Sequence, residues 1–221
     1  MQSAKGAEML IGIPVYEGVD LLDVTGPYEM FTWAKLDVRL FAETPGLVTC
    51  NGGLEIQARC SFAEAPAFDV LWTPGGNPPA LQRILAEPKH TYLDFLRRQA
   101  AGARYVASVC EGALLLAAAG LLDGYAVTTH WAFIPCLLAH YPAVKVVDGH
   151  PRFHLDRNRL TGGGISSGLD EALELIRLLL GQEMAESVQQ TTQYYPDPPV
   201  HSEIPQTIAC PLDEITATAR P

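Results

Sequence analysis

The chain has 221 residues, enough for one α/β domain with a substantial core, and its formal net charge is −10 at pH 7. Its 25 acidic residues against 15 basic ones leave no basic stripe, so the sequence predicts no nucleic-acid partner. No apolar run approaches the ~18 residues of a membrane span, and the polar start, residues 1–8, is too short for a secretion signal. Five cysteines, an odd number without a CxxC pair, argue for a reducing compartment and a cytoplasmic location, and against a disulfide framework or a zinc site.

Short apolar runs alternate with helical patterns along the chain. Residues 9–15 are a continuous apolar run, typical of a parallel strand buried on both faces, with Pro14 at its carboxyl end. The helical pattern over 20–34 is interrupted at Gly26, which predicts a broken start and a firmer helix from Pro27. Further strands are expected at 38–42, 54–58, 69–73, 105–109, 126–129, 144–147 and 159–161. Further helices are expected at 79–86, 91–102, 113–122, 166–181 and 183–194.

This alternation predicts a mostly parallel sheet with helices on both faces, in a single domain over residues 1–195. Residues 196–221 are rich in proline and are expected to form an irregular arm or tail, which could lie on a neighbouring subunit. Ligands of parallel sheets bind beyond the carboxyl ends of the strands. Four turns would converge there: those after 9–15, after Thr73, at Cys110 and at 162–164.

Cys110 is the candidate nucleophile, because it follows a strand pattern directly and precedes Glu111, Gly112 and an Ala/Leu-rich helix. A thiol on such a turn faces the amide groups and the positive dipole end of the helix, which favour the thiolate and lower the pKa. The alternative is a small buried hydrophobic residue, the role expected of the other four cysteines. These are Cys50, Cys60, Cys136 and Cys210.

A thiol nucleophile needs a group that moves protons, and Asp23 is the best candidate for it. Apolar neighbours flank Asp23, so its side chain is expected to point into a partly buried site. The alternative role is that of a helix cap ahead of Pro27, and for Asp20 a cap or a surface position is favoured. Glu111 is either a second proton carrier or a carboxylate that favours the helix N-terminus. Ionised, Glu111 would oppose thiolate formation, and protonated it could donate a hydrogen bond to the sulfur.

The backbone amides of Gly76 and Glu111 are candidate oxyanion donors, with Gly75 in the same turn, although Gly75 and Gly76 also fit a plain turn. The glycine-rich segment 161–168 matches neither nucleotide-binding spacing, so it predicts a helix cap at Ser166 or Ser167. His130 follows a strand pattern and could complete a Cys–His pair, or be a structural histidine. The other histidines lack metal-ligand spacing, and no metal is expected.

The ordered set of motifs resembles the DJ-1/PfpI superfamily, and within it the isocyanide (isonitrile) hydratases, over nearly the whole chain. The motifs are Leu22-Asp23-Val24-Thr25-Gly26-Pro27, Thr73-Pro74-Gly75-Gly76, Ser108-Val109-Cys110-Glu111-Gly112, Ala118-Ala119-Gly120-Leu121-Leu122, Thr128-Thr129-His130-Trp131-Ala132 and Leu160-Thr161-Gly162-Gly163-Gly164-Ile165. The resemblance implies a flavodoxin-like three-layer α/β sandwich, a homodimer, no cofactor, Cys110 as nucleophile in strained geometry and Asp23 as the acid that contacts it. One departure concerns Glu111, where the hydratases carry threonine and many PfpI-type members carry histidine, so the fold and the nucleophile carry over more safely than the substrate.

The resemblance implies a cysteine-dependent lyase that acts on a small molecule and converts isocyanides to N-substituted formamides. Two alternatives use the same Cys110. One is a glyoxalase III or amidase-like hydrolase, in which His130 could take part. The other is a non-enzymatic, redox-sensing dimer, in which a low-pKa Cys110 is oxidised to the sulfinate.

Overall fold

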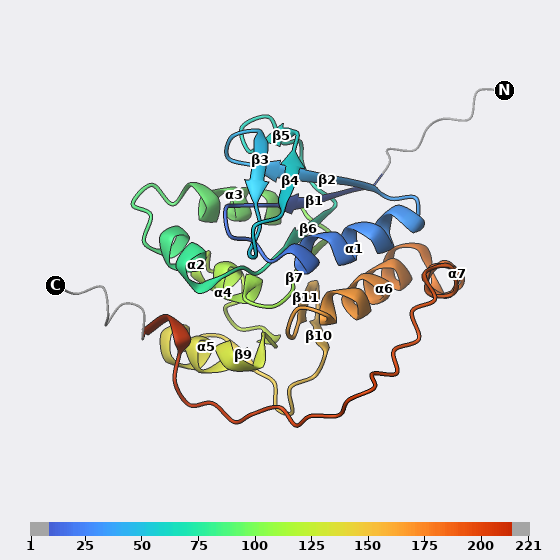
Figure 1. Ribbon diagram of the computed structural model, residues 1–221. Helices are drawn as coiled ribbons and strands as arrows, with labels where there is room; N and C mark the ends of the chain where they lie inside the picture. Colours follow the sequence, from blue (N-terminus) through green and yellow to red (C-terminus); the bar gives the residue numbers. More distant parts are fainter. Residues whose placement is uncertain (1–8, 214–221) are drawn as a thin grey trace.

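A computed structural model describes residues 9–213 and places a mostly parallel sheet at the centre of the molecule (Figure 1). Its strand order is β10-β11-β7-β6-β1-β2-β5, and only β10 runs antiparallel to its neighbour. The strands of this sheet are β1 (Leu10–Pro14), β2 (Asp37–Ala42), β5 (Cys60–Ser61), β6 (Val70–Thr73), β7 (Tyr105–Ser108), β10 (Phe153–Asp156) and β11 (Arg159–Gly162). Two small sheets pair β3 (Gly46–Thr49) with β4 (Glu55–Ala58) and β8 (Ala126–Val127) with β9 (Lys145–Val146).

Helices cover both faces of the sheet, as the alternating pattern predicts (Figure 1). Apolar side chains of one face pack against α1 (Leu21–Trp33), α6 (Ser167–Leu180) and α7 (Gln182–Thr192). Those of the other face pack against α2 (Pro78–Leu85), α3 (Thr91–Ala100), α4 (Gly112–Ala118) and α5 (Ile134–His140), which follows the 3-10 turn Trp131–Phe133. The predicted three-layer α/β fold is therefore confirmed.

The strand order places a switch point between β1 and β6. From β1 the chain turns to β2 on one side, and it returns to β6 and β7 on the other side. A crevice forms beyond the carboxyl ends of the strands at such a point, because the connections leave in opposite directions. The turns after β1, β6, β7 and β11 meet there. The fold thus assembles a site from four segments that are far apart in the sequence.

The first helix differs from the prediction. It runs unbroken over Leu21–Trp33 with Pro27 inside it, whereas the sequence predicts a firm helix only from Pro27. Proline lacks the N–H that would bond the carbonyl of Asp23 one turn earlier. The Trp72 indole N–H on β6 donates to that carbonyl at 3.0 Å instead. A tertiary hydrogen bond therefore replaces the one that the helix loses.

The cysteines also differ from the prediction, because Cys136 on α5 forms a disulfide with Cys210. The sequence predicts no disulfide and a reducing environment, and the pairing corrects the first of these. The two residues are separated by 74 positions, and no spacing motif marks them. Cys50 is buried as expected, and Cys60 is half-buried, each as a free thiol.

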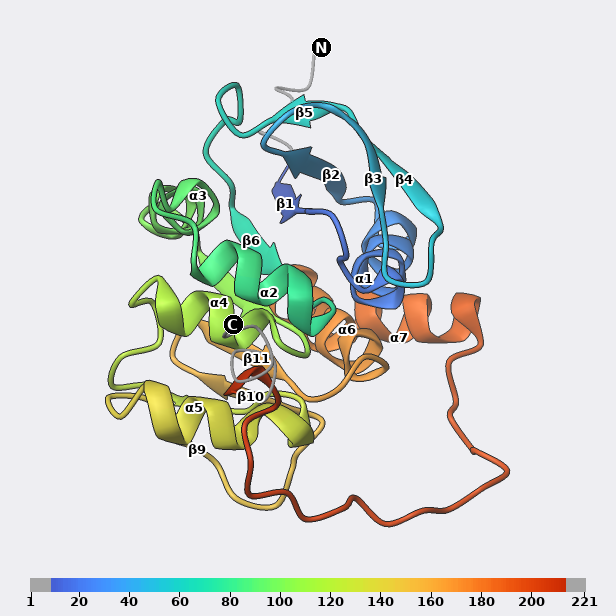
Figure 2. The ribbon, with the colours of Figure 1, turned by 60° about the vertical axis from the view of Figure 1, so that its left-hand side comes forward.

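The C-terminal segment after α7 forms an exposed strap that loops outward from the body and returns to it at α5 (Figures 1 and 2). It has no regular structure over 195–209, as its prolines predict, and it returns to α5 at Cys210. In this chain the arm is thus attached to its own body at Cys210, while residues 195–206 are exposed. The last predicted part of the tail, 214–221, and the polar start, 1–8, lie outside the described residues. Within 9–213, every helix is too short or too polar to cross a membrane.

Candidate active site

Cys110 lies on a sharp turn between β7 and α4, buried with 1% of its surface exposed. Its φ is +55°, a left-handed conformation that is uncommon outside glycine and marks functional turns. The turn also requires Gly112, because a Cβ there would lie 2.1 Å from the carbonyl oxygen of Thr73 on the neighbouring strand. The cysteine and the glycine therefore form one structural unit, and the turn has the strained elbow geometry that the sequence predicts.

Asp23 reaches the same place from the first turn of α1, with no exposed surface. The Trp72 bond to its carbonyl fixes its backbone, and the amide of Gly75 donates to Oδ2 at 2.9 Å. Its other oxygen, Oδ1, has no hydrogen-bond partner. Burial first and then the nearby Glu111 carboxyl raise the pKa of Asp23 well above its usual range, while the Gly75 amide lowers it. Asp23 is therefore a buried carboxyl with a raised pKa, and its side chain accepts from Gly75 in the turn after β6.

Glu111 follows Cys110 directly and is 5% exposed. Desolvation raises its pKa from 4.5 to about 7, although contacts with Cys110 and with the amides of Glu111 and Gly76 lower it. Near neutral pH this carboxyl is thus divided between its protonated and its ionised form. Both roles that the sequence leaves open for Glu111, proton carrier and negative charge beside the sulfur, are accessible within one pH unit of neutrality.

The electrostatics of the Cys110 thiol oppose the sequence prediction. Desolvation, followed by the charges of Glu111 and Asp23, raises the pKa of Cys110 well above its ordinary value. The amide of Ile165 faces the sulfur and lowers the pKa, but it does not reverse the direction. The prediction of a lowered pKa considered only the helix, and α4 has just 7 residues. Attack by this sulfur therefore requires a base that takes its proton.

One donor atom from each of Asp20, Asp23, Cys110 and Glu111 lies within 4.8 Å of the other three. Such a set could hold a cation, but a divalent metal needs its ligands deprotonated. Burial raises the pKa of Asp23, Cys110 and Glu111, which favours their protonated forms over the binding of such a metal. Interacting groups of this kind titrate together and exchange protons among themselves. The arrangement is suited to moving protons between a thiol and two carboxyls.

The predicted oxyanion donors lie beside the cluster. A Cβ on Gly75 would be 2.4 Å from Glu111 Oε2, so only glycine lets this turn approach the carboxyls. The Gly75 amide is bonded to Asp23, while the amides of Gly76 and Glu111 face the Glu111 carboxyl. In this state both predicted donors thus face a protein carboxyl. They would become free for a substrate only when the Glu111 side chain turns aside.

His130 lies apart from the carboxyl cluster, which does not include it. Its Nδ1 accepts a hydrogen bond from the Ala132 amide at 3.2 Å, and burial lowers its pKa. Its ring lies so close to Gly164 that a Cβ there would be 2.4 Å from the His130 Cδ2 atom. The preceding residue contacts the elbow, since Thr129 Oγ1 donates to the Cys110 carbonyl at 2.8 Å. The structure thus favours a supporting position for His130 over a Cys–His pair.

Sequence reasoning missed Tyr16 and undervalued Asp20. The Tyr16 hydroxyl donates to the Pro74 carbonyl at 3.3 Å, and a Cβ on Gly76 would lie 2.9 Å from that hydroxyl. Asp20, predicted to be a cap or a surface residue, makes no side-chain cap and accepts from Asn51 Nδ2 at 2.8 Å. Their positions in the sequence could have indicated them, because both residues closely follow the carboxyl end of β1, where ligands of parallel sheets bind.

The chain is similar in sequence to known proteins. A sequence model of the DJ-1/PfpI family matches residues 9–178. An isonitrile hydratase of Pseudomonas putida is 40% identical over 213 residues, which cover 96% of this chain and 90% of that protein.

Solved structures agree as well. A THiJ/PfpI family protein from Pseudomonas syringae is 33% identical and superposes with a TM-score of 0.79, over 97% of this chain and 87% of that one. Drosophila melanogaster DJ-1beta is 21% identical and has a TM-score of 0.75, over 84% of this chain and 98% of that one. The second likeness shows the fold alone.

Proposed function

Because the chain belongs to the DJ-1/PfpI family, we propose that it is a cofactor-independent hydratase that converts isocyanides to N-substituted formamides with Cys110 as nucleophile. The observation that carries the proposal is the buried cluster in which the Cys110 sulfur lies among the carboxyls of Asp23 and Glu111. A relative that is 40% identical over 96% of the chain is an isonitrile hydratase, which supports the choice of substrate.

In the first step the Asp23 carboxylate accepts the thiol proton while the sulfur attacks the terminal carbon of the isocyanide. Asp23 acts in its ionised form, which the Gly75 amide bonded to Oδ2 favours, although burial and the Glu111 carboxyl raise its pKa overall. The same proton then passes from Asp23 to the attacked carbon. The product is a thioimidate in which Cys110 is bonded to carbon and the carbon is doubly bonded to nitrogen.

In the second step Asp23 takes a proton from water, whose oxygen adds to the thioimidate carbon, and the nitrogen receives a proton. Glu111 can supply that proton because its pKa of about 7 keeps much of it protonated at neutral pH. As the tetrahedral intermediate collapses, its hydroxyl gives its proton to the Glu111 carboxylate, the carbon–sulfur bond breaks, and the Cys110 sulfur takes the proton that Asp23 holds. The sum is one isocyanide plus one water giving one formamide, with no redox change.

The test is formamide production from cyclohexyl isocyanide. Cys110→Ala is expected to abolish it, and Asp23→Asn is expected to slow it at least ~10²-fold, the usual loss for a general acid or base. Cys60→Ala, a half-buried free thiol at the sheet edge, is the matched control and should retain full activity. Turnover by Cys110→Ala at the wild-type rate would end the proposal. Consumption of methylglyoxal with no consumption of isocyanide would favour the glyoxalase alternative.

A redox-sensing role receives less support, because the raised pKa of Cys110 works against the thiolate that oxidants attack. The proposal includes a homodimer, for which Leu22, Tyr28 and Trp33 offer exposed apolar surface on α1. Light scattering should give twice the 23.9 kDa of one chain. The proposal also includes a cytoplasmic location. Because cytosolic reductants keep most thiols reduced, a Cys136–Cys210 disulfide found in cells would count against the cytoplasmic location.

A further inference from the structure

The C-terminal strap, residues 195–213, borders a cavity next to the elbow. The cavity has a volume of about 370 Å³, and its lining includes Leu22, Thr129, Trp131, Ile165 and, from the strap, Ile204. Thr129 bonds the Cys110 carbonyl, and the Ile165 amide faces the sulfur. Leu22 also precedes Asp23 in α1. The cavity therefore lies next to Cys110 and Asp23, because Thr129, Ile165 and Leu22 line it and also adjoin these two residues.

The lining combines apolar side chains, which would hold a small neutral group, with the polar side chains of Thr129, His130, His150, Arg152, Ser166 and Ser167. Leu22, Trp131, Ile165 and Ile204 offer hydrocarbon surface. The positive charge of Arg152, also in the lining, is paired with Asp170, to which its Nε donates at 2.6 Å. The volume is at the lower end of the roughly 300–1,000 Å³ of small-molecule sites.

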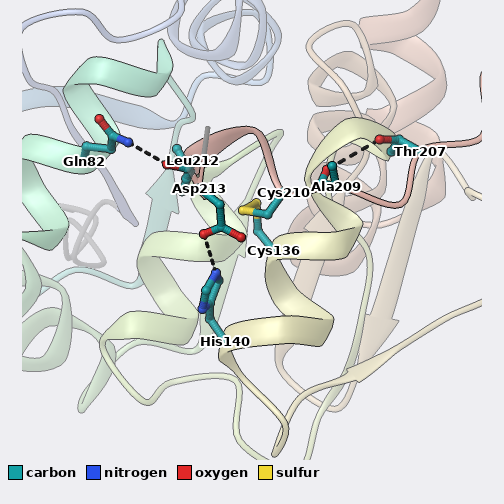
Figure 3. Close-up of a disulfide and its surroundings, with 8 residues drawn as sticks. All are labelled: Gln82, Cys136, His140, Thr207, Ala209, Cys210, Leu212 and Asp213. Carbon is teal, nitrogen blue, oxygen red and sulfur yellow. Dashed lines mark hydrogen bonds and ion pairs between the residues drawn. A yellow bond between two sulfur atoms is a disulfide. The ribbon is translucent and has the colours of Figure 1, made fainter. Parts of the chain in front are cut away.

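The strap is fixed at its ends only. At one end the Tyr194 hydroxyl, just before the strap, donates to Asp170 at 3.2 Å. At the other end Cys210 is bonded to Cys136, and Gln82 Nε2 donates to the Leu212 carbonyl at 2.7 Å (Figure 3). In the described chain, the hydrogen bonds of residues 196–209 stay within the strap itself. The position of Ile204 against the cavity therefore depends on these end attachments.

We propose that this cavity holds the N-substituent of the isocyanide, that Ile204 limits the substituent's size, and that the Cys136–Cys210 disulfide holds this wall in place. The inference rests on the proposed function and names the specificity of its site. A dithiol reductant would break this disulfide and free the strap. The two thiols of the reductant give up two electrons and two protons and form a cyclic disulfide, while Cys136 and Cys210 become thiols. Reduction then lets the strap move away and admits larger substituents.

The experiment compares methyl isocyanide with 2-naphthyl isocyanide as substrates of the full chain. Ile204→Ala is expected to raise kcat/KM for the naphthyl compound at least ~10-fold relative to the methyl compound, the discrimination that a few methylenes give in an apolar pocket. Ile208→Ala is the matched control, because Ile208 is in the same strap but 98% exposed and outside the lining. Dithiothreitol, and separately Cys210→Ala, should shift the ratio in the direction of Ile204→Ala. If the naphthyl-to-methyl ratio is unchanged in Ile204→Ala, or shifts equally in Ile208→Ala, then Ile204 does not limit the size of the substituent.

A second measurement does not depend on isocyanide turnover. The rates at which N-methylmaleimide and N-phenylmaleimide modify Cys110 are followed by peptide mass mapping in the same proteins. The phenyl-to-methyl ratio should rise in Ile204→Ala and after reduction. A rise without any isocyanide hydration would support the wall and refute the proposed function. Alkylation of Cys136 and Cys210 in denatured protein before any reduction would overturn the disulfide anchor.

Discussion

Glu111 gives the site a measurable pH signature in protein stability. Its pKa is raised from 4.5 to about 7 by burial, so in the folded protein it holds a proton that the unfolded chain has released. Between these values the folded state binds more protons, and stability falls as the pH rises. Each pKa unit corresponds to about 1.4 kcal/mol, so the ionised carboxyl reduces the free energy of unfolding by about 3 kcal/mol at pH 8.

Replacing Glu111 by Gln removes this penalty and keeps the shape of the side chain. At pH 4.5 the wild-type carboxyl is mostly protonated when folded and about half ionised when unfolded, so it contributes little. The difference in unfolding free energy, Glu111→Gln minus wild type, is therefore expected to increase by about 3 kcal/mol from pH 4.5 to pH 8. Titrating groups outside the cluster are present in both proteins and cancel in this difference, whereas the loss of the Glu111 charge also relieves the raised pKa of Asp23 and Cys110, which acts in the same direction.

Urea denaturation followed by tryptophan fluorescence at the two pH values gives the measurement. Glu183→Gln, at an exposed position in the first turn of α7, is the control, and its difference should stay within about 0.5 kcal/mol. If Glu111→Gln and wild type differ by the same amount at pH 4.5 and pH 8, the Glu111 carboxyl does not carry the raised pKa, and its part in the proton cluster is refuted.

Two further predictions concern the residues that hold the site in place. Gly112→Ala should lower the free energy of unfolding by about 3 kcal/mol or more, because its Cβ would lie 2.1 Å from the Thr73 carbonyl oxygen. Gly102→Ala is the control and should change the free energy of unfolding little, because open space surrounds that position. Equal thermal melts for the two variants would contradict the elbow packing. Trp72→Phe should cost about 1–3 kcal/mol because it leaves the Asp23 carbonyl unpaired. In a double-mutant cycle Pro27→Ala should recover about 1 kcal/mol of that loss by supplying the missing N–H, and strict additivity would refute the exchange of hydrogen bonds.

The sequence predicts the elbow well because all of its determinants are local. A strand pattern, a cysteine, a glycine two residues later and a helix pattern are adjacent along the chain. The glycine is required because of a close contact with Thr73, but its place two residues after the cysteine is visible in the sequence without knowledge of that contact. The position of Asp23 follows in the same way, since residues just beyond the end of a parallel strand lie at the ligand-binding edge.

Features that depend on distant partners were not predictable from local patterns. The continuity of α1 across Pro27 depends on Trp72, which is 49 positions from Asp23. The direction of the Cys110 pKa depends first on burial and then on the charges of Glu111 and of Asp23, which comes from α1, and not on the helix that follows Cys110. The Cys136–Cys210 bond spans 74 positions and follows an irregular segment. Short elements such as β5, β10 and α5 also escape, because they extend over too few residues to show a period.

The electrostatics of the cluster select the kind of molecule that can enter it. Asp20, Asp23 and Glu111 bring three carboxyls to one thiol, and Cys110 is 1% exposed, so an anionic substrate would meet both repulsion and a desolvation cost. A neutral isocyanide meets neither, and its terminal carbon accepts a sulfur nucleophile directly. Burial and the same carboxyls raise the pKa of the thiol, which disfavours the thiolate that oxidants attack. The high pKa of Cys110 is therefore compatible with catalysis, provided that Asp23 removes its proton during the attack.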